Sequence, residues 1–344
     1  MEMNQQEEAK VLLRIQDLKQ YFRVKGSGGI GKKPQYVRAI DGITLDIYEG
    51  ETLGLVGESG CGKSTFGRSI LQLYPEMGGE VLYYGRTQGE GVNLGKLNKK
   101  EMNQMRKELQ LVFQDPYSSL NPKMTVGEII AEGVRLHGIR TERKEIEQYT
   151  KGILKSCGLS DSMMHRYPHE FSGGQRQRVG IARSLALNPK FLVCDEAVSA
   201  LDVSVQSQIM NLLMDLKERE HLTYLFISHD LGVIRYISDR IGVMYLGKIV
   251  ELSRCDALFR QPLHPYTKVL LSAIPSVDSK HLTPRELIGE PPSPSNPPSG
   301  CRFHTRCPYC EDICTEQEPK LSEVESGHQV ACHFAKALSG TLPF

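Results

Sequence analysis

The sequence predicts an α/β protein with a mostly parallel core sheet, an antiparallel β subdomain and an inserted helical subdomain. Partial alternation of apolar and polar residues at 11–18 and 37–47 indicates an antiparallel pair of strands. A helical, richly charged pattern at 125–157 indicates the helical insertion. Short apolar runs are typical of strands buried on both faces of a parallel sheet, and they occur at residues 52–57, 191–195, 224–228 and 241–246.

Length and charge narrow the classes of function. A chain of 344 residues is long enough for one large domain and an appendage. Its 42 Lys and Arg residues nearly balance 41 Asp and Glu residues, and this net charge of +1 argues against a nucleic acid as partner. No run reaches the roughly 18 apolar residues of a membrane span, and MEMNQQEEAK lacks the basic and apolar character of a signal peptide. These features predict a cytoplasmic protein.

The stretch GESGCGKST at 57–65 fits the phosphate-binding pattern GxxxxGKS/T, and it lies between a buried-strand run and a helical pattern. Its glycines let successive backbone amides point at phosphates, and the helix N-terminus adds its dipole. Lys63 is expected at the β and γ phosphates, Ser64 at Mg²⁺ and Thr65 at the α phosphate. The alternative is a glycine-rich turn that binds nothing. The predicted contacts are Gly57, Glu58, Ser59, Gly60, Cys61, Gly62, Lys63, Ser64 and Thr65.

An acidic pair ends another buried run, FLVCDE at 191–196. We expect Asp195 to hold Mg²⁺ and Glu196 to orient or deprotonate the attacking water. Alone, such a pair could equally satisfy the dipole of a helix N-terminus. The phosphate-binding loop upstream favours the catalytic interpretation.

Four further motifs specify the type of nucleotide site. They are Gln114 in LQLVFQDP, FSGGQRQR at 171–178, SALD at 199–202 and SHD at 228–230. Each alone has a structural interpretation, such as a helix start capped by Ser172. In this order the set resembles the nucleotide-binding subunits of ABC transporters, with P-loop, Q-loop, signature sequence, Walker B, D-loop and H-loop in turn. The resemblance covers roughly residues 11–255.

The resemblance implies further roles for single residues. The signature sequence, in which Phe171 replaces the usual leucine, would cap the γ phosphate bound to an opposite subunit, so a dimer is implied. An aromatic ring near the end of the first strand, Phe22 with Tyr21 as the alternative, would stack on adenine. The implied nucleotide contacts beyond the P-loop are Phe22, Gln114, Ser172, Gly173, Gly174, Gln175, Asp202 and His229. The implied magnesium ligands are Ser64, Gln114 and Asp195, and the implied catalytic residues are Lys63, Gln114, Glu196 and His229.

Two stretches narrow the resemblance. YPHEFSGGQRQR at 167–178, and HPYTKVLLSAIP at 264–275 followed by GEPPSPSNPPSGCRFHTRCP, resemble the ATP-binding subunits of oligopeptide and dipeptide importers. Alternatively, HPY opens an amphipathic helix packed on the domain. The implied partners are a second ABC ATPase in a heterodimer, two membrane-spanning permeases and an extracytoplasmic peptide-binding protein, and the implied location is the cytoplasmic face of the membrane. An importer of nickel or another small solute stays open, and a soluble ABC ATPase of DNA repair or translation is less favoured.

The expected division is an ABC nucleotide-binding domain at 1–255, with its helical subdomain at about 115–170, and a C-terminal extension at 256–344. The proline-rich EPPSPSNPPSG forbids helix and sheet and predicts an extended strap before the cysteine-rich tail.

Five of the nine cysteines follow residue 300, and a reducing compartment disfavours disulfides. The pair Cys307 and Cys310 has the CxxC spacing of zinc sites. The importer resemblance implies instead a [4Fe-4S] cluster that does not depend on Cys310, and we favour it over zinc. The implied cluster ligands are Cys301, Cys307, Cys314 and Cys332, and the zinc alternative adds Cys310 with His304, His328 or His333.

Overall fold

The computed structural model describes residues 10–24, 34–74, 78–85, 89–272 and 289–338. These residues form two compact units. Unit 1 contains the described residues of 1–16, 44–51 and 79–224, and unit 2 those of 17–43, 52–78 and 225–344. Four strands begin in one unit and end in the other: β1 (Val11–Arg23), β2 (Tyr36–Tyr48), β4 (Gly78–Tyr83) and β8 (Thr223–Ile227).

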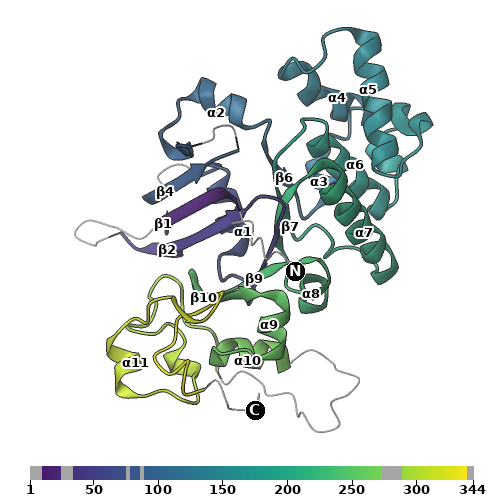
Figure 1. The fold of residues 1–344 in the computed structure, drawn as a ribbon. Coiled ribbons are helices and arrows are strands. Elements are labelled where there is room, and N and C mark those ends of the chain that lie inside the picture. The colour runs from purple at the N-terminus through teal and green to yellow at the C-terminus, as the bar shows by residue number, and fades with distance from the viewer. Residues whose placement is uncertain (1–9, 25–33, 75–77, 86–88, 273–288, 339–344) are drawn as a thin grey trace, which may run out of the picture. The chain divides into compact units, whose positions relative to one another are not determined.

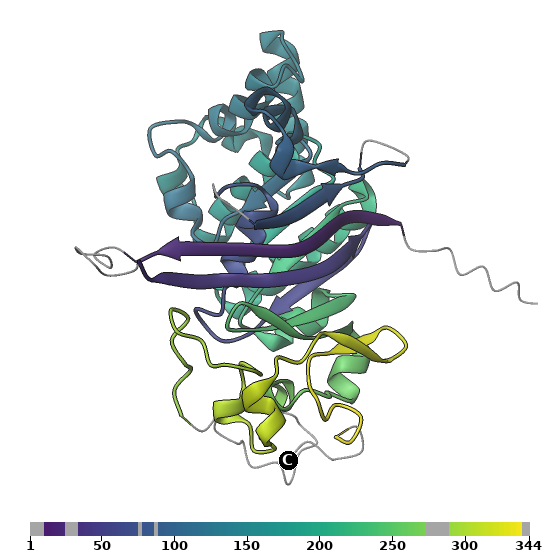
Figure 2. The same cartoon turned by 90° about the vertical axis from the view of Figure 1, so that its left-hand side faces the viewer.

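Two groups of strands lie wholly or partly in unit 1. The order β2-β1-β4-β5 forms an antiparallel subdomain, in which β5 (Val92–Asn93) pairs antiparallel with β4. Figure 2 shows β1 and β2, in purple, as two long strands side by side. The strands β6 (Leu109–Val112) and β7 (Phe191–Asp195) pair in parallel, and β7 is buried along its whole length.

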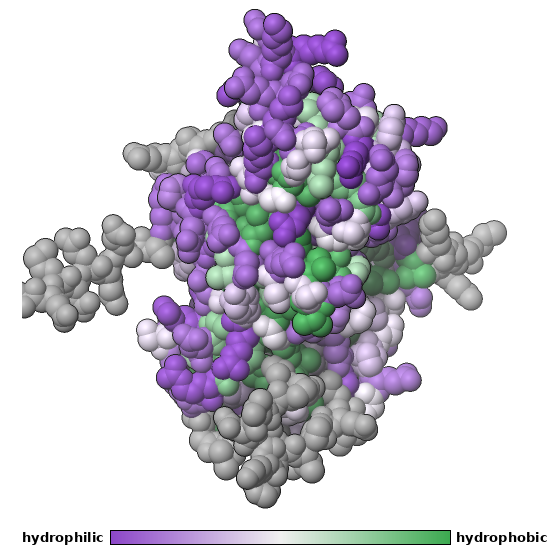
Figure 3. Space-filling view, turned by 90° about the vertical axis from the view of Figure 1, so that its right-hand side faces the viewer, coloured by the Kyte–Doolittle hydropathy of each residue, from purple (hydrophilic) through white to green (hydrophobic). Residues whose placement is uncertain are grey.

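The helices of unit 1 are α2 (Lys99–Met105), α3 (Pro116–Ser119), α4 (Val126–Leu136), α5 (Arg143–Ser156), α6 (Gly173–Leu185) and α7 (Val203–Glu220). Short 3₁₀ turns occur at Leu94–Lys96, Asp161–His165 and Pro168–Glu170. A capping box starts α4, since the Thr125 and Glu128 side chains each accept a hydrogen bond from the other's backbone N–H. α4 packs on α5 and α6 (Figure 1). Hydrophilic side chains cover much of the helical region of unit 1, at the top of Figure 3.

Unit 2 contains strands in the order β11-β12-β10-β9-β3. β3 (Thr52–Val56) pairs in parallel with β9 (Arg240–Tyr245), whereas β10 (Lys248–Arg254), β12 (His328–Val330) and β11 (Ser322–Glu325) add antiparallel pairs. The helices are α1 (Lys63–Ile70), α8 (Leu231–Ile237), α9 (Cys255–Arg260), α10 (Pro265–Ser272) and α11 (Asp312–Glu316), with a 3₁₀ turn at His304–Arg306.

A buried carboxylate ties the C-terminal part of unit 2 to β10. Glu251, fully buried, accepts hydrogen bonds from the backbone N–H groups of Leu263 and His264, at 2.8 and 3.0 Å. The Nε2 of His328 lies 2.7 Å from the same carboxylate. Because a buried charge is stable only when its oxygens are satisfied, this network fixes α10 and β12 on the strand.

The fold class predicted from the sequence is confirmed, with parallel pairs in the core, the antiparallel subdomain and the helical insertion. The apolar runs form β3, β7, β8 and β9. The described part of the proline-rich stretch, 290–300, contains neither helix nor strand. Its Pro294 carbonyl accepts a hydrogen bond from the Arg38 N–H of β2 at 3.1 Å.

Candidate functional site

The P-loop, residues 57–65, leaves the buried strand β3 and enters α1. Gly57 and Gly62 have φ angles of 151° and 111°, which an L side chain rarely adopts. A Cβ atom on Gly57 would lie 2.1 Å from the Met244 carbonyl oxygen, and one on Gly62 would lie 2.2 Å from the Ala39 carbonyl oxygen. Glycine is therefore required at both positions by conformation and by space.

Lys63 is buried at the start of α1. Its Nζ donates to the carbonyl oxygens of Gly57 and Glu58, at 2.7 and 3.1 Å. The ammonium group is thus held inside the loop by the loop's own backbone. This is the position from which a lysine serves phosphates cradled by the loop.

The acidic pair ends β7 in unit 1. Asp195 is fully buried, and Glu196 has a φ of 49°, a left-handed conformation that is uncommon for a glutamate. The Gln114 Nε2 donates to the Glu196 Oε2 at 2.8 Å. β6 and β7 are parallel neighbours, so the segments after both strands emerge at one edge of the sheet. The contact between Gln114 and Glu196 follows from that topology.

Residues 113–119, which follow β6, form the Q-loop segment. Two arginines of α6 contact this segment. Arg183 Nη1 donates to the Ser119 carbonyl oxygen at 2.6 Å, and its guanidinium lies 5.6 Å from the centre of the Phe113 ring. Arg176 lies 5.6 Å from the centre of the Tyr117 ring. The Tyr117 side chain is 63% exposed.

The signature sequence begins α6 as the sequence predicts. Ser172 is the N-cap, and its Oγ accepts a hydrogen bond from the Gln175 N–H at 3.3 Å. A Cβ on Gly174 would lie 2.4 Å from Cγ1 of Val205 in α7, so the glycine allows α7 to approach closely. Asp202, at the N-cap of α7, is exposed, and its side chain makes no capping hydrogen bond.

Phe22, His229 and the P-loop all belong to unit 2. The Phe22 ring meets the Tyr74 ring edge-on, with centroids 5.1 Å apart. Tyr21, the alternative for adenine stacking, donates its hydroxyl to Asp41 and carries the Arg38 guanidinium over its ring. Burial, together with the bond to Asp41, raises the pKa of Tyr21 to about 12. His229 follows β8 and is exposed.

The predicted site residues are therefore divided between the units. Unit 1 holds Gln114, Ser172, Gly173, Gly174, Gln175, Asp195, Glu196 and Asp202. Unit 2 holds Phe22, the nine P-loop residues, His229 and the cysteine-rich tail. Within unit 1, Gln114 and Glu196 come from different motifs and are joined by a hydrogen bond.

The four cysteines implied as cluster ligands line one pocket of the tail. Cys301, Cys307, Cys314 and Cys332 share it with His304 and His333, among other residues. Exposed Cys310 is not among its described lining residues. Burial raises the pKa of the Cys301 thiol to about 12 and that of Cys307 to about 11, and the neighbouring thiols add to both shifts. In the part of the chain that the structure describes, however, no three His, Cys, Asp or Glu side chains are placed so that they could hold a metal ion.

The histidines of the zinc alternative are differently engaged. His328 is buried against Glu251. The His304 Nδ1 lies 2.9 Å from the Cys301 carbonyl oxygen, and the His333 Nε2 lies 3.0 Å from the Gln317 carbonyl oxygen.

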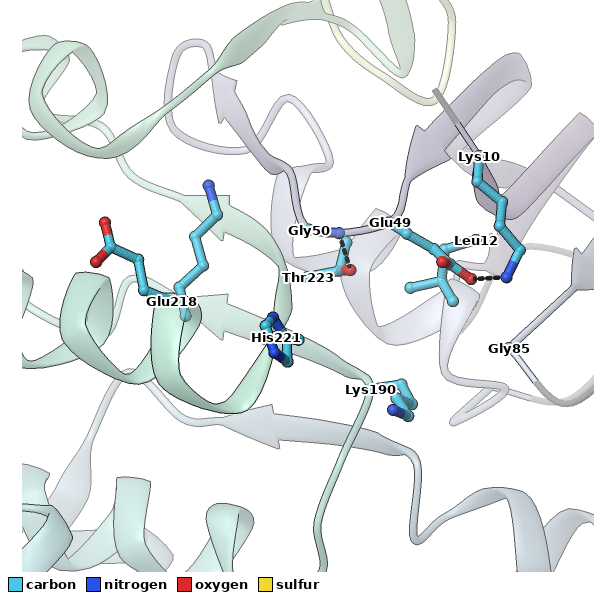
Figure 4. A pocket seen from close by; sticks show the side chains of 10 residues that line it. Lys10, Leu12, Glu49, Gly50, Gly85, Lys190, Glu218, His221 and Thr223 are labelled. Atoms are coloured by element: carbon cyan, nitrogen blue, oxygen red, sulfur yellow. Dashed lines mark hydrogen bonds and ion pairs between the residues drawn. The ribbon is translucent and has the colours of Figure 1, made fainter. Parts of the chain in front are cut away.

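A separate pocket of unit 1 lies at the amino end of β7, away from the acidic pair at its carboxyl end. Figure 4 shows its lining, in which Lys10 pairs with Glu49 at 2.8 Å and Lys190, Glu218 and His221 surround the opening. None of the predicted site residues is among its described lining residues. We assign it no role.

Two contacts of the P-loop escape the sequence analysis. Arg306 binds the Glu58 carboxylate, and the Tyr266 hydroxyl binds the Glu58 N–H. Tyr266 belongs to the HPY stretch, which the sequence alone also allows as a simple packing helix. No local pattern connects either residue with Glu58, which precedes Arg306 by 248 positions.

Among the described helices, none combines the length and the apolar character needed to cross a membrane.

Known protein families and individual proteins are similar to this chain. The family description "ABC transporter" matches residues 40–199, and "Oligopeptide/dipeptide transporter, C-terminal region" matches residues 250–314. The putative oligopeptide transport ATP-binding protein YkfD of Bacillus subtilis is 52% identical over 325 residues, which cover 94% of this chain and 95% of that protein. The oligopeptide transport ATP-binding protein OppF of Escherichia coli is 49% identical over 327 residues, covering 94% of this chain and 96% of its own.

A solved structure shares the fold. The dimeric bacterial ABC transporter cassette MJ0796 is 27% identical, with a TM-score of 0.61, and the match covers 71% of this chain and 99% of that one. The same cassette has been solved in a dimeric post-hydrolysis state bound to ADP and Pi, at 26% identity and the same TM-score.

Proposed function

The chain belongs to the ABC transporter family, and from that membership we propose that it hydrolyses ATP to power the import of peptides. The observation that carries the hydrolytic part is the 2.8 Å hydrogen bond from Gln114 to Glu196 at the end of β7. It joins the proposed Q-loop residue to the proposed general base. The peptide part is supported by the match of residues 250–314 to the C-terminal region of oligopeptide and dipeptide transporters.

Each proposed catalytic side chain has a distinct task. Lys63, held at the P-loop backbone, offers positive charge to the β and γ phosphates. Glu196 orients the attacking water and accepts its proton, and Gln114 and His229 help to place that water and the γ phosphate. Ser64, Gln114 and Asp195 present the oxygens that suit Mg²⁺, a hard cation. When bound, Mg²⁺ neutralises charge on the phosphates.

We propose that adenine stacks on Phe22 and that the γ phosphate meets Ser172, Gly173, Gly174, Gln175 and Asp202 of a second ATPase. The start of α6 supports this arrangement, because a helix N-terminus with small residues favours close approach of a phosphate. One chain supplies one P-loop and one signature sequence. A complete site therefore needs two ATPase chains, which we propose form a heterodimer.

The remaining partners are proposed to be two permeases and an extracytoplasmic peptide-binding protein, with this chain bound peripherally at the cytoplasmic face of the membrane. The exposed Tyr117 ring in the Q-loop segment supports a protein partner for this surface. We also propose an ABC nucleotide-binding domain at 1–255, with a helical subdomain at about 115–170, and a C-terminal extension at 256–344.

The decisive experiment measures ATPase rate against protein concentration, for the chain alone and with its partner ATPase and permeases. We expect a low rate alone and a rate restored by pairing, whereas a high, concentration-independent rate in a monomer would contradict the proposal. Uptake of labelled peptides and of nickel by the assembled transporter then identifies the cargo. Nickel uptake without peptide uptake would favour the small-solute alternative.

For the tail we propose a [4Fe-4S] cluster held by Cys301, Cys307, Cys314 and Cys332, with zinc as the alternative. The donor types support it, since four thiols line one pocket and cysteine thiolates are the usual ligands of such clusters. The described side chains are not placed to hold a metal ion in this structure, so the thiols would have to move together when the cluster binds. Bound there, the cluster would stabilise a short segment that has few buried apolar residues.

Anaerobic purification should yield a brown protein with about four irons and four sulfides per chain. Replacing Cys310 with Ser should leave that content unchanged, while Cys314→Ser should abolish it. A colourless protein with one zinc per chain, lost in Cys310→Ser, would support the CxxC site instead.

A further inference from the structure

The C-terminal extension binds the P-loop at Glu58. Arg306 Nη1 lies 3.1 and 3.0 Å from the two carboxylate oxygens of Glu58, and the Tyr266 hydroxyl accepts a hydrogen bond from the Glu58 N–H at 2.8 Å. The Glu58 carbonyl oxygen accepts a hydrogen bond from Lys63 at 3.1 Å. Glu58 thus connects two residues of the extension with the lysine that serves the phosphates.

This contact is largely shielded from water. The Arg306 and Glu58 side chains are 5% and 23% exposed. The rings of Tyr245, Tyr266 and Phe303 pack on one another, with centroids 4.7 to 5.4 Å apart, and the Tyr245 hydroxyl lies 3.4 Å from Arg306 Nη1. In such an apolar environment an ion pair is stronger than at an open surface, and loss of one partner leaves the other charge uncompensated.

A second arginine of the same segment holds the turn that supports the P-loop. Arg302 donates to Asp41 and, at 3.0 Å, to the Leu246 carbonyl oxygen. Leu246 and Gly247 form the turn between β9 and β10, and the Gly247 N–H donates to the Cys61 carbonyl oxygen of the P-loop at 2.9 Å. Both arginines lie within residues 301–307.

The charge of Glu58 needs an explanation, because a carboxylate in a loop that binds a polyanion opposes that binding. Two unit negative charges about 8 Å apart repel each other by about 2 kcal/mol at an effective dielectric constant of about 20. Arg306 supplies the positive charge that compensates the Glu58 carboxylate, and its contacts with both carboxylate oxygens fix the position of that group.

We propose that Arg306 is a positioning residue of the nucleotide site, which acts through Glu58 to neutralise its charge and to keep its carbonyl oxygen on Lys63. The proposal rests on the proposed ATPase function. It gives the extension a part in nucleotide binding, and it makes Glu58 and Arg306 a coupled pair rather than two independent contacts.

The test measures the dissociation constant of MgATP and the KM and kcat of the assembled transporter for four variants. Arg306→Met should weaken MgATP binding and raise KM about tenfold, with kcat at saturating ATP within about twofold. Arg306→Lys, which keeps the charge, should recover most of the affinity. Combining Arg306→Met with Glu58→Gln should return the dissociation constant to within about threefold of wild type, because the unpaired carboxylate is gone.

The matched control is Glu318→Gln. Glu318 forms another ion pair between the extension and the core, with Lys248 at 2.6 Å, and this partner belongs to β10 and not to the P-loop. This variant should bind MgATP like wild type. Thermal melting of all variants identifies any that fail to fold, and for such a variant the Lys replacement still tests the charge.

Three outcomes separate the possibilities. Wild-type protein that binds no MgATP would refute the proposed function itself. Wild-type binding with an unchanged Arg306→Met variant would overturn the positioning role alone. Weak binding in Arg306→Met that Glu58→Gln makes worse would assign Arg306 a purely structural role and also overturn it.

Discussion

The P-loop and the Q-loop segment each carry one of the proposed catalytic residues, Lys63 and Gln114, and they are held in different ways. Buried groups hold the P-loop: its own backbone binds Lys63, and Arg306 and Tyr266 bind Glu58. The Q-loop segment rests on Arg176 and Arg183 of α6, through ring contacts and one backbone carbonyl.

The difference fits the proposed tasks of the two loops. A loop that binds the same phosphates in every cycle gains from a fixed conformation, since preorganised dipoles need no rearrangement. A segment proposed to respond to a permease must move at low cost, and partly buried contacts such as the Arg183 hydrogen bond to Ser119 open more easily than fully buried ones. Four variants test the proposed site and the contacts that support it, from the largest expected effect to the smallest.

The largest effect is expected at the end of β7. Glu196→Gln removes the proposed general base but keeps an oxygen that can accept the Gln114 hydrogen bond. ATP hydrolysis should fall by about 10²- to 10⁴-fold, or about 3 to 5.5 kcal/mol in barrier height, while MgATP binding persists. Steady-state ATPase assays and equilibrium binding measure the two. Glu218→Gln, at the unit 1 pocket, is the control, and a Glu196→Gln rate within threefold of wild type would contradict the assignment.

The second prediction concerns Glu251, which attaches the C-terminal extension to β10. Replacing this buried residue with Ala leaves two backbone N–H groups and His328 without their acceptor. The free energy of unfolding should fall by about 3 to 5 kcal/mol, measured by urea denaturation. The control is Glu323, an exposed carboxylate of the extension that accepts a hydrogen bond from the Gly327 N–H at 2.7 Å. Glu323→Ala should lower the free energy of unfolding far less. Equal losses in the two variants would show that the buried network carries no special stability.

A pH dependence should come from His264. Burial lowers its pKa from 6.5 to about 4, so the folded chain keeps the imidazole neutral where the unfolded chain takes up a proton. The stability that this histidine contributes is complete above pH 6.5 and is lost as the pH falls to about 4, by about 3 kcal/mol.

His264→Asn keeps an acceptor for the Tyr266 N–H and should flatten that part of the curve of stability against pH. Urea midpoints collected from pH 7 to pH 4 give the curve. His221→Asn, at an exposed residue, should leave the curve as in wild type. An undiminished acid slope in His264→Asn would assign it to another group.

The smallest effect is expected for the hold on the Q-loop segment. Arg183→Met removes the hydrogen bond to Ser119 and the cation over Phe113. Local opening of residues 113–119 should become easier by about 1 to 2 kcal/mol, measured by hydrogen exchange, with MgATP affinity unchanged. Arg178→Met is the matched control on α6, since Arg178 binds the Cys157 carbonyl oxygen at 2.9 Å instead. Faster exchange in both variants alike would indicate a general loosening of α6.

The sequence predicts the features that depend on residues close together in the chain. The apolar runs of β3 and β7 are buried along their whole length, and the P-loop has the glycines that its backbone requires. The sequence does not predict β10, because KIVELSR contains a glutamate, a residue typical of exposed positions. In the structure Glu251 is fully buried. β11 and β12 are short and polar, and only pairing with β10 makes them strands.

The candidate site divides in the same way. Motif order located Gln114 and Glu196, and the parallel pairing of β6 and β7 explains why they meet. The contact of Arg306 with Glu58 depends on how a distant segment packs, and no periodicity or spacing signals such a contact.

The separation between Glu58 and Arg306 also bears on how the protein is made. A ribosome synthesises the chain from the N-terminus, so the P-loop emerges 248 residues before the arginine that binds it. Once His229 has been made, the nascent chain has every proposed nucleotide-binding motif but still lacks Arg306. Contacts of such long sequence separation form slowly, because closing the loop costs entropy. The proposed role of Arg306 therefore predicts that full affinity for ATP is acquired only late in synthesis, which would limit nucleotide binding by incomplete chains.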